Sequence, residues 1–330
     1  MARALWYVGA EKAELREEEV AAAKPGEVRV HAMFGGISRG TERLVHQGRV
    51  PPSEYERMRA PFMGGSFPFP VKYGYATVGR IVSGPRELQQ RLVFTLHPHQ
   101  DVFNLPAAAA VPIPETVPAS RAVLAANMET ALNGLWDGTP GPADRIAIVG
   151  GGTVGLLLAY LCVRLPGAEV TLVDVVASRA ALADAVGARF AKPVDAPQNC
   201  DLVFHASGTG AGLATALRLA GEEATIVEMS WYGQGDVAAP FGEAFHSRRL
   251  RLLSSQVGRV APSHRLRWTP ARRIAAAISL LADPVLDKLL APPLGFEDLP
   301  DKLALVFTPE GNGLCPIVRY PAATNTNGRR

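Results

Sequence analysis

Three glycines in a fixed spacing, Gly150, Gly152 and Gly155, separate the apolar run Ile146–Val149 from a longer apolar run. In this spacing the first glycine permits a tight turn and the second lets a ligand approach the backbone. The third lets a following helix pack closely on the strand. The N-terminus of such a helix presents unpaired N–H groups to phosphate oxygens. The pattern predicts a site for the pyrophosphate of a dinucleotide, formed by Gly150, Gly152, Thr153, Val154 and Gly155.

A carboxylate follows at the distance that this interpretation requires. Asp174 comes directly after the apolar run Val170–Val173, and 174 − 155 gives 19 residues after Gly155. The usual separation is about 20 residues. A carboxylate at this place accepts hydrogen bonds from a ribose 2′-hydroxyl and repels a 2′-phosphate. We therefore predict that NAD(H) is preferred over NADP(H).

The glycine segment also has an alternative interpretation as a membrane span. Ile146–Val163 is an uncharged run of 18 residues, which reaches the length needed to cross a bilayer. Glycines divide the run into one piece of strand length and one of helix length, and Arg145 and Arg164 bracket it closely. We therefore predict no membrane span and no membrane partner.

The composition narrows the possible partners and the compartment. A net charge of +3 is too small to indicate a nucleic-acid partner, so the basic clusters at 248–251 and 265–273 are expected to form a solvated face. The three cysteines are scattered, with neither a disulfide framework nor a paired zinc motif. The N-terminal segment becomes charged too early for a secretion signal. These features predict a cytoplasmic protein.

The elements that position these residues fall into two kinds. Residues 1–118 are predicted to be β-rich, because Glu27–Ala32 alternates charged and apolar positions and Tyr75–Val82 and Arg91–Leu96 are further strand candidates. Residues 119–283 begin with a predicted helix, Ala119–Trp136, and then alternate between strands and helices, which indicates a parallel, doubly wound sheet. Residues 284–330 return to strand and turn character and are expected to complete the first domain.

In this second part, apolar runs bounded by glycine, proline and polar residues define the expected elements. The strands are Val170–Val173, Asp201–Ala206, Ala224–Met229 and Leu250–Val257, and the later helices are Ser178–Val186, Leu213–Ala220 and Thr269–Ala282.

This order resembles that of the medium-chain dehydrogenase/reductase family. The resemblance rests on GGISRGTE (35–42), KYGYATVG (72–79), NMETAL (127–132), the glycine motif with Asp174, and DLVFHASG (201–208). It implies an α/β fold with a GroES-like catalytic domain at 1–118, completed by 284–330, and a Rossmann NAD-binding domain at 119–283. It also implies an oxidoreductase that uses a nicotinamide cofactor.

The residues that bind catalytic zinc in many members of that family are replaced here. Ser38 stands where a cysteine is expected, and Tyr75 and Ala76 replace the histidine and glutamate of a G-H-E triplet. The third position falls near Ala126, and residues 82–105 contain no cysteine for a structural zinc lobe. Zinc prefers Cys, His and carboxylate ligands, so we expect no zinc.

The resemblance also implies cofactor roles for several polar residues. Arg39 matches a pyrophosphate-binding arginine, Thr130 a threonine near the nicotinamide, and Arg179 a basic residue beside the adenosine ribose. Ser207 and Ser230 end two predicted strands, at the edge where a cofactor should lie. The alternatives are surface arginines and strand-end caps.

Without zinc, the negative charge on a substrate oxygen must be stabilised by hydrogen-bond or proton donors. Tyr75 is the first candidate and Ser38 the second, with Glu42 as a charged orienting group. Tyr75 could instead be a packed aromatic residue, and Glu42 an exposed acid. His97 and His99 could relay protons, although two histidines in a proline-containing loop are more typically surface groups.

Three functions remain open. The first is hydride transfer between NAD(H) and an alcohol or ketone, and the second is reduction of an activated C=C bond. The third is cofactor binding by a protein whose catalytic site has decayed. Ser38–Arg43 and the triplet 73–75 are similar to the bacteriochlorophyllide dehydrogenase branch, which oxidises a hydroxyethyl group. We also expect a homodimer that is joined through the edge strand near Leu250–Val257.

Overall fold

The computed structural model describes residues 1–308 and 314–322, and the chain divides into two compact units. One unit comprises Met1–Ala126 with Leu290–Arg330, and the other comprises Asn127–Leu289. The predicted boundaries, after residues 118 and 283, differ from these. The short helix after residue 118 belongs to the first unit, and the short helix after residue 283 belongs to the second. Helix α2 (Ala119–Ala122) packs against β3 and β6 of the first unit, and η6 (Pro284–Leu289) packs against α5 of the second.

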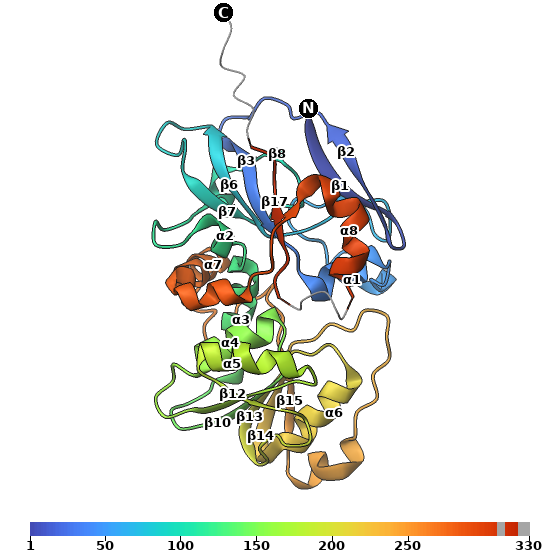
Figure 1. Cartoon of the computed structure of the whole chain (residues 1–330), viewed down its shortest axis with the longest axis vertical. Helices are drawn as coiled ribbons and strands as arrows, with labels where there is room; N and C mark the ends of the chain where they lie inside the picture. The colour runs from blue at the N-terminus through green and yellow to red at the C-terminus, as the bar shows by residue number, and fades with distance from the viewer. Residues whose placement is uncertain (309–313, 323–330) are drawn as a thin grey trace, which may run out of the picture. The chain divides into compact units, whose positions relative to one another are not determined.

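The first unit is built on two sheets. The larger has the order β16-β17-β3-β6-β7-β9, with β8 also paired to β3, and the smaller has the order β2-β1-β5-β4. The predicted strand at Glu27–Ala32 is present as part of β3 (Glu27–Gly36), where Val28, Val30 and Ala32 are buried at alternate positions. Strand β17 (Ile317–Arg319) pairs antiparallel with β3, so the C-terminal segment completes this unit (Figure 1).

The remaining strands of the first unit are β1 (Ala2–Gly9), β2 (Lys12–Glu18), β4 (Gly64–Gly65), β5 (Val71–Lys72), β6 (Thr77–Ser83), β7 (Leu92–Thr95), β8 (Val102–Pro106), β9 (Val111–Pro112) and β16 (Leu294–Gly295).

The second unit contains a parallel sheet of six strands in the order β12-β11-β10-β13-β14-β15. Numbered along the chain from β10, this is the order 3-2-1-4-5-6 of dinucleotide-binding sheets. The order in which successive strands are added reverses between β10 (Arg145–Val149) and β13 (Cys200–His205), although these two strands are parallel. The crevice for a ligand lies at their carboxyl ends. The other strands are β11 (Glu169–Val173), β12 (Arg189–Ala191), β14 (Ala220–Glu228) and β15 (Arg251–Ser254).

The apolar run after the glycines forms α4 (Thr153–Cys162), a buried helix of 10 residues. The other helices of this unit are α5 (Ala180–Val186), α6 (Gly210–Leu219) and α7 (Pro270–Ser279), and α3 (Ala125–Gly138) begins at the boundary. Helix α5 ends at Gly187 in the left-handed conformation, as the glycine there predicts. Within 1–308 and 314–322, no helix has the length and apolar character to cross a membrane.

Three helical features depart from the sequence predictions. The helix expected over Ala119–Trp136 is two helices, because a turn at residues 123 and 124 separates α2 from α3. Helix α1 (Arg39–His46) lies within the segment predicted to be β-rich, and α8 (Leu299–Val306) lies in the segment predicted to hold strands and turns. Helix α8 buries Leu299, Leu303 and Val306, a spacing of four and three residues that is typical of one helical face.

Candidate functional site

The turn between β10 and α4 can be formed only by glycine at two of its three motif positions. Gly150 has φ +112°, and a Cβ there would lie 2.6 Å from the backbone nitrogen of Ser207. A Cβ at Gly155 would lie 1.8 Å from the carbonyl oxygen of Gly150. At Gly152, by contrast, a Cβ would meet no heavy atom of the described residues within 4 Å. The space in front of Gly152 therefore suits the close approach of a ligand, as the motif predicts.

Asp174 lies against this turn. Its carboxylate accepts hydrogen bonds from the N–H of Gly151 at 2.5 Å and of Val176 at 2.8 Å. The aliphatic part of Arg179 also contacts Gly151, whose added Cβ would be 3.2 Å from Arg179 Cγ. Thr153 and Val154 form the first turn of α4 and are half-buried. The structure thus brings together the glycines, the carboxylate and Arg179. Each carboxylate oxygen of Asp174 can still accept a bond from a ligand hydroxyl.

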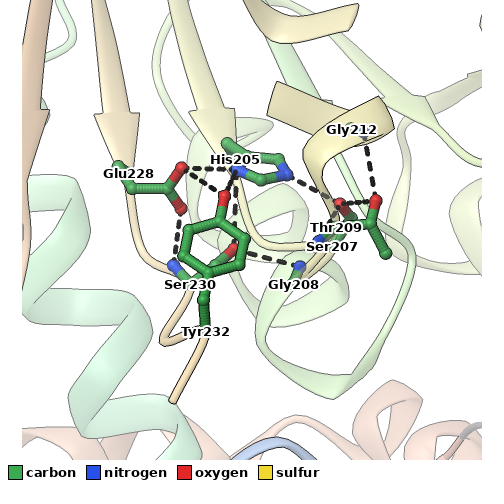
Figure 2. Close-up of polar contacts among 8 residues, drawn as sticks. All are labelled: His205, Ser207, Gly208, Thr209, Gly212, Glu228, Ser230 and Tyr232. Atoms are coloured by element: carbon green, nitrogen blue, oxygen red, sulfur yellow. Dashed lines mark hydrogen bonds and ion pairs between the residues drawn. The ribbon is translucent and has the colours of Figure 1, made fainter. Parts of the chain in front are cut away.

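Ser207 and Ser230 also lie close to one another. The hydroxyl of Ser230 accepts a hydrogen bond from the N–H of Gly208 at 3.0 Å, and Ser207 Oγ lies 2.6 Å from His205 Nε2 (Figure 2). His205 and Glu228, whose side chains are 2.7 Å apart, are not among the residues predicted for the site. These two residues end adjacent strands and are direct partners in the β13–β14 register. The sequence signal that could have identified them is a polar residue at the carboxyl end of each of the two apolar strands, β13 and β14.

Ser38, Glu42 and Tyr75 come together in the first unit. Glu42, on α1, is completely buried, which corrects the alternative of an exposed acid. Its carboxylate accepts bonds from Ser38 N at 2.8 Å and from the Tyr7 hydroxyl at 3.2 Å, and lies 2.8 Å from His99 Nε2. The helical turn from residue 38 to residue 42 positions the first of these contacts.

Burial raises the pKa of Tyr75 to about 12, and the nearby charge of Glu42 acts in the same direction. Hydrogen bonds from the hydroxyls of Ser38 and Thr41 partly oppose this shift. The phenol therefore stays protonated throughout the physiological pH range and can donate a hydrogen bond.

His97 and His99 are buried, so the prediction that they are surface groups is wrong. Burial lowers the pKa of His97 to about 3, and its ring stacks on Phe103 with 3.6 Å between the ring centroids. His99 contacts Glu42 and lies 3.4 Å from the hydroxyl of Tyr320. The proline-containing loop folds inward because its histidines find aromatic and carboxylate partners.

The other predicted site residues occupy different places. Arg39 begins α1, and its guanidinium hydrogen-bonds the carbonyl oxygen of Thr308 in the same unit. Thr130 lies on α3 in the second unit and is half-buried.

One basic residue also differs from expectation. Arg273 is only 2% exposed and pairs with Glu129 at 3.0 Å, so it does not belong to a solvated basic face.

The residues at the expected zinc positions do not fit a zinc ion. Ala76 and Ala126 offer no ligand atom, and a phenol with a raised pKa, as at Tyr75, is a poor ligand because metal binding requires deprotonation. Burial raises the pKa of the Cys315 thiol to about 12, and the nearby charge of Glu42 acts in the same direction, so this thiol is also a poor zinc ligand. Among the residues described, no group of three or more His, Cys, Asp or Glu side chains is arranged to hold a metal.

The structure is similar to solved dehydrogenases over nearly the whole chain. One is a Sinorhizobium meliloti protein called a zinc-binding dehydrogenase, bound to NADP, with a TM-score of 0.77, 19% identity, and coverage of 97% of this chain and 99% of that one. Another is an Escherichia coli protein called a short chain alcohol dehydrogenase, complexed with NADH, with a TM-score of 0.77, 17% identity, and coverage of 96% of this chain and 99% of that one.

L-idonate 5-dehydrogenase from Escherichia coli gives a TM-score of 0.78 at 16% identity and covers 97% of this chain and 98% of its own. No family model matches the sequence. At these identities the likeness concerns the fold. The chain has the fold of the medium-chain dehydrogenases/reductases, with a GroES-like unit and a Rossmann unit.

Proposed function

We propose that the protein is an oxidoreductase that transfers hydride between NAD(H) and a small alcohol or ketone without a zinc ion. The observation that carries this proposal is the β10–α4 turn, where Gly152 leaves space for a ligand and the Asp174 carboxylate lies beside it. Solved proteins of the same fold bind NADP or NADH, which supports a nicotinamide cofactor.

The chain's own residues suit the parts of such a cofactor. The first-turn N–H groups of α4 would hold the pyrophosphate, and Asp174 would accept hydrogen bonds from the adenosine ribose. The carboxylate charge favours NAD(H), since it would repel the additional phosphate of NADP(H). When bound, the nicotinamide ring supplies the hydride acceptor or donor. Thr130, Arg39, Ser207 and Ser230 remain candidates for further contacts with the cofactor.

Tyr75 is the group that we assign to the substrate oxygen. Reduction of a ketone leaves negative charge on that oxygen, and a donor aimed at it lowers the barrier. Even with a pKa of about 12, a phenol is a stronger acid than an aliphatic alcohol, so Tyr75 can also protonate an alkoxide. Ser38 orients the phenol, and Glu42 holds Ser38 through the backbone N–H.

The donor set supports a site without zinc. Lewis-acid catalysis needs ligands that hold the metal. Here Ser38, two alanines and a protonated phenol take the ligand positions. The buried carboxylate of Glu42 already accepts bonds from the Tyr7 hydroxyl and the Ser38 N–H.

Turnover with a substrate panel tests the proposed function. The purified protein is incubated with NADH and a series of ketones, quinones and enones, with and without a zinc chelator, and its metal content is measured. We expect ketone reduction that the chelator leaves unchanged. Reduction of enones alone would favour the C=C reaction instead, and binding of NADH without any turnover would favour a decayed enzyme. One tightly bound zinc per chain would overturn the zinc-free assignment.

A further inference from the structure

A chain of polar side chains crosses the carboxyl ends of β13 and β14 in the second unit. Glu228 Oε2 lies 2.7 Å from His205 Nδ1, and His205 Nε2 lies 2.6 Å from Ser207 Oγ. Ser207 Oγ in turn lies 3.0 Å from Thr209 Oγ1, and Tyr232 donates to Glu228 at 2.9 Å. Figure 2 shows the imidazole of His205 between the carboxylate on one side and the two hydroxyls on the other.

The direction of each hydrogen bond in this network is set by the carboxylate at its half-buried end, Glu228. Burial by itself would raise the pKa of Glu228, but its bonds and charge interaction with His205, together with the Ser230 N–H, hold the pKa below its usual value. Glu228 is therefore an ionised carboxylate that only accepts hydrogen bonds. With a neutral imidazole, His205 donates to it from Nδ1, and Nε2 accepts the Ser207 hydroxyl proton.

The same logic extends to the rim of the sheet. Because Ser207 uses its single proton on His205, Thr209 must donate its own proton to Ser207 Oγ. Thr209 Oγ1 accepts the N–H of Gly212 at 3.1 Å as the N-cap of α6. A hydroxyl oxygen can accept two hydrogen bonds. Among the described residues, the Gly212 N–H is the one group that donates to Thr209 Oγ1. One lone pair of this exposed hydroxyl therefore remains for a ligand.

Gly212 is required for this arrangement. A Cβ at this position would lie 2.0 Å from Ser207 Oγ and 2.6 Å from His205 Nε2. A side chain on this turn of α6 would thus push the serine and histidine apart. The glycine leaves room for the chain of hydrogen bonds, and helix packing alone does not explain it.

The network of hydrogen-bonded side chains that begins at Glu228 ends at Thr209, in the crevice where the sheet order reverses. Ser207 lies directly against Gly150 of the glycine turn, and β10 and β13 are neighbours in the sheet. Ligands of doubly wound sheets bind in this crevice. We propose that Thr209 Oγ1 is a hydrogen-bond acceptor for a ribose hydroxyl of the dinucleotide, with its polarity set by Glu228 through His205 and Ser207. This inference rests on the proposed function, because it requires the cofactor to bind in this crevice.

An acceptor of this kind distinguishes between two classes of ligand group. Because a carboxylate polarises it, it binds groups that donate a proton and repels phosphate or carboxylate oxygens. His205, Ser207 and Glu228 act as positioning residues, and only Thr209 contacts the cofactor.

Fluorinated cofactors test this distinction, since fluorine in place of a hydroxyl cannot donate a hydrogen bond. The dissociation constants of NADH and of analogues with each ribose hydroxyl replaced in turn by fluorine are measured for the wild-type protein. We expect two analogues to bind about tenfold more weakly. One is fluorinated at the adenosine 2′ position, which Asp174 contacts, and the other at the hydroxyl that Thr209 contacts.

Glu228→Gln tests the polarity of the chain with little change in shape. In this variant the Gln carbonyl would accept the Ser230 N–H, so the Gln NH₂ would face His205 Nδ1. Each hydrogen bond from His205 to Thr209 would then run in the opposite direction, and the Thr209 hydroxyl would donate to the ligand. We expect the penalty for the second analogue to fall below about threefold, while the adenosine 2′ penalty stays. Glu222→Gln, on the exposed part of the same strand, is the matched control and should behave as the wild type.

Each outcome decides between the claims. If NADH binds and the Glu228→Gln variant keeps the full second penalty, or if the wild type shows no second penalty, the inference is overturned and the proposed function stands. If the wild type binds no nicotinamide cofactor, both are overturned. Ser207→Ala breaks the network at another link and frees the Thr209 hydroxyl to donate, so it should lower the second penalty, and it decides the question if Glu228→Gln does not fold.

Discussion

Tyr75 takes the place where the resemblance to zinc dehydrogenases implies a histidine ligand. The burial that makes the phenol a poor metal ligand also keeps it protonated as a hydrogen-bond donor. The same residue therefore supports both halves of the proposal, the loss of zinc and the presence of a donor.

Tyr75→Phe removes the donor and leaves the ring. We expect kcat for ketone reduction to fall about 100-fold or more, as for other lost acid catalysts. The dissociation constant for NADH and the circular dichroism spectrum should stay unchanged. Because the pKa of Tyr75 is about 12, the wild-type rate should show no loss from phenol ionisation below about pH 11. An unchanged kcat in the variant would remove Tyr75 from the mechanism.

His97 gives a prediction for acid stability. Its pKa is about 3 in the folded protein, against an unperturbed value of 6.5. Between these values the unfolded chain binds a proton that the folded chain does not, so stability falls as the pH falls. The slope is about 1.4 kcal/mol per pH unit, or about 2 kcal/mol between pH 6.5 and 4.5.

His97→Phe keeps an aromatic ring against Phe103 and removes the titration. In urea unfolding, the variant should lose about 2 kcal/mol less than the wild type over this pH window. Equal losses in both proteins would show that His97 becomes protonated in the folded state.

Sequence spacing predicted the residues of the site that lie close in the chain. Gly150 to Asp174 span one strand–helix–strand unit, so local geometry fixes their relation. His205 and Glu228 are 23 residues apart, and they meet only through the register of two parallel strands. The burial of Glu42 and His99 likewise depends on a contact across 57 residues. A single sequence carries no signal for such pairings beyond the polar residues themselves.

At the scale of elements, helices α3 and α7 are joined by a buried polar cluster. Arg273 of α7 donates to Glu129 at 3.0 Å and to Asn133 at 2.5 Å, both on α3. Burial raises the pKa of Glu129, and the charge of Arg273 opposes this shift. A cation removed from such a pair leaves a buried carboxylate without its partner.

Arg273→Leu should therefore lower the free energy of unfolding by about 3 kcal/mol or more. The adjacent Arg272→Leu is the control, because Arg272 is exposed and stacks on Trp268. Its effect should stay below about 1 kcal/mol. Chemical denaturation followed by fluorescence measures both. Similar losses in the two variants would contradict the structural role of the pair.

Periodicity predicted the Rossmann elements better than those of the first unit. Strands β10, β11, β13 and β14 are buried on both faces and appear as apolar runs, so their existence could be predicted within a few residues. Helix α1 escaped because its sequence, RGTERLVH, buries a glutamate and a histidine in addition to its apolar residues. Buried polar positions disrupt the pattern on which such predictions depend.

For the whole molecule, the edge of the Rossmann sheet is the surface that we expect to join two copies. Strand β15 ends the sheet, and all of its residues are exposed, including Leu252 and Leu253 at 38% and 39%. An exposed apolar edge strand can pair with another chain, and a twofold axis makes such pairing self-complementary.

Leu253→Lys places a charge on this edge and should convert the dimer to a monomer in sedimentation equilibrium. Leu266→Lys is the control, since Leu266 is 96% exposed and lies outside the strand. A wild-type protein that sediments as a monomer would contradict the predicted dimer.

We propose that the β10–α4 turn and Asp174 bind NAD(H). Titration of the wild-type protein with NADH and with NADPH, followed by nucleotide fluorescence, tests it most directly. We expect NADH to bind at least about tenfold more tightly, because the Asp174 carboxylate repels the additional phosphate. Equal or tighter binding of NADPH would contradict the role assigned to Asp174, and failure to bind either nucleotide would contradict the proposed function.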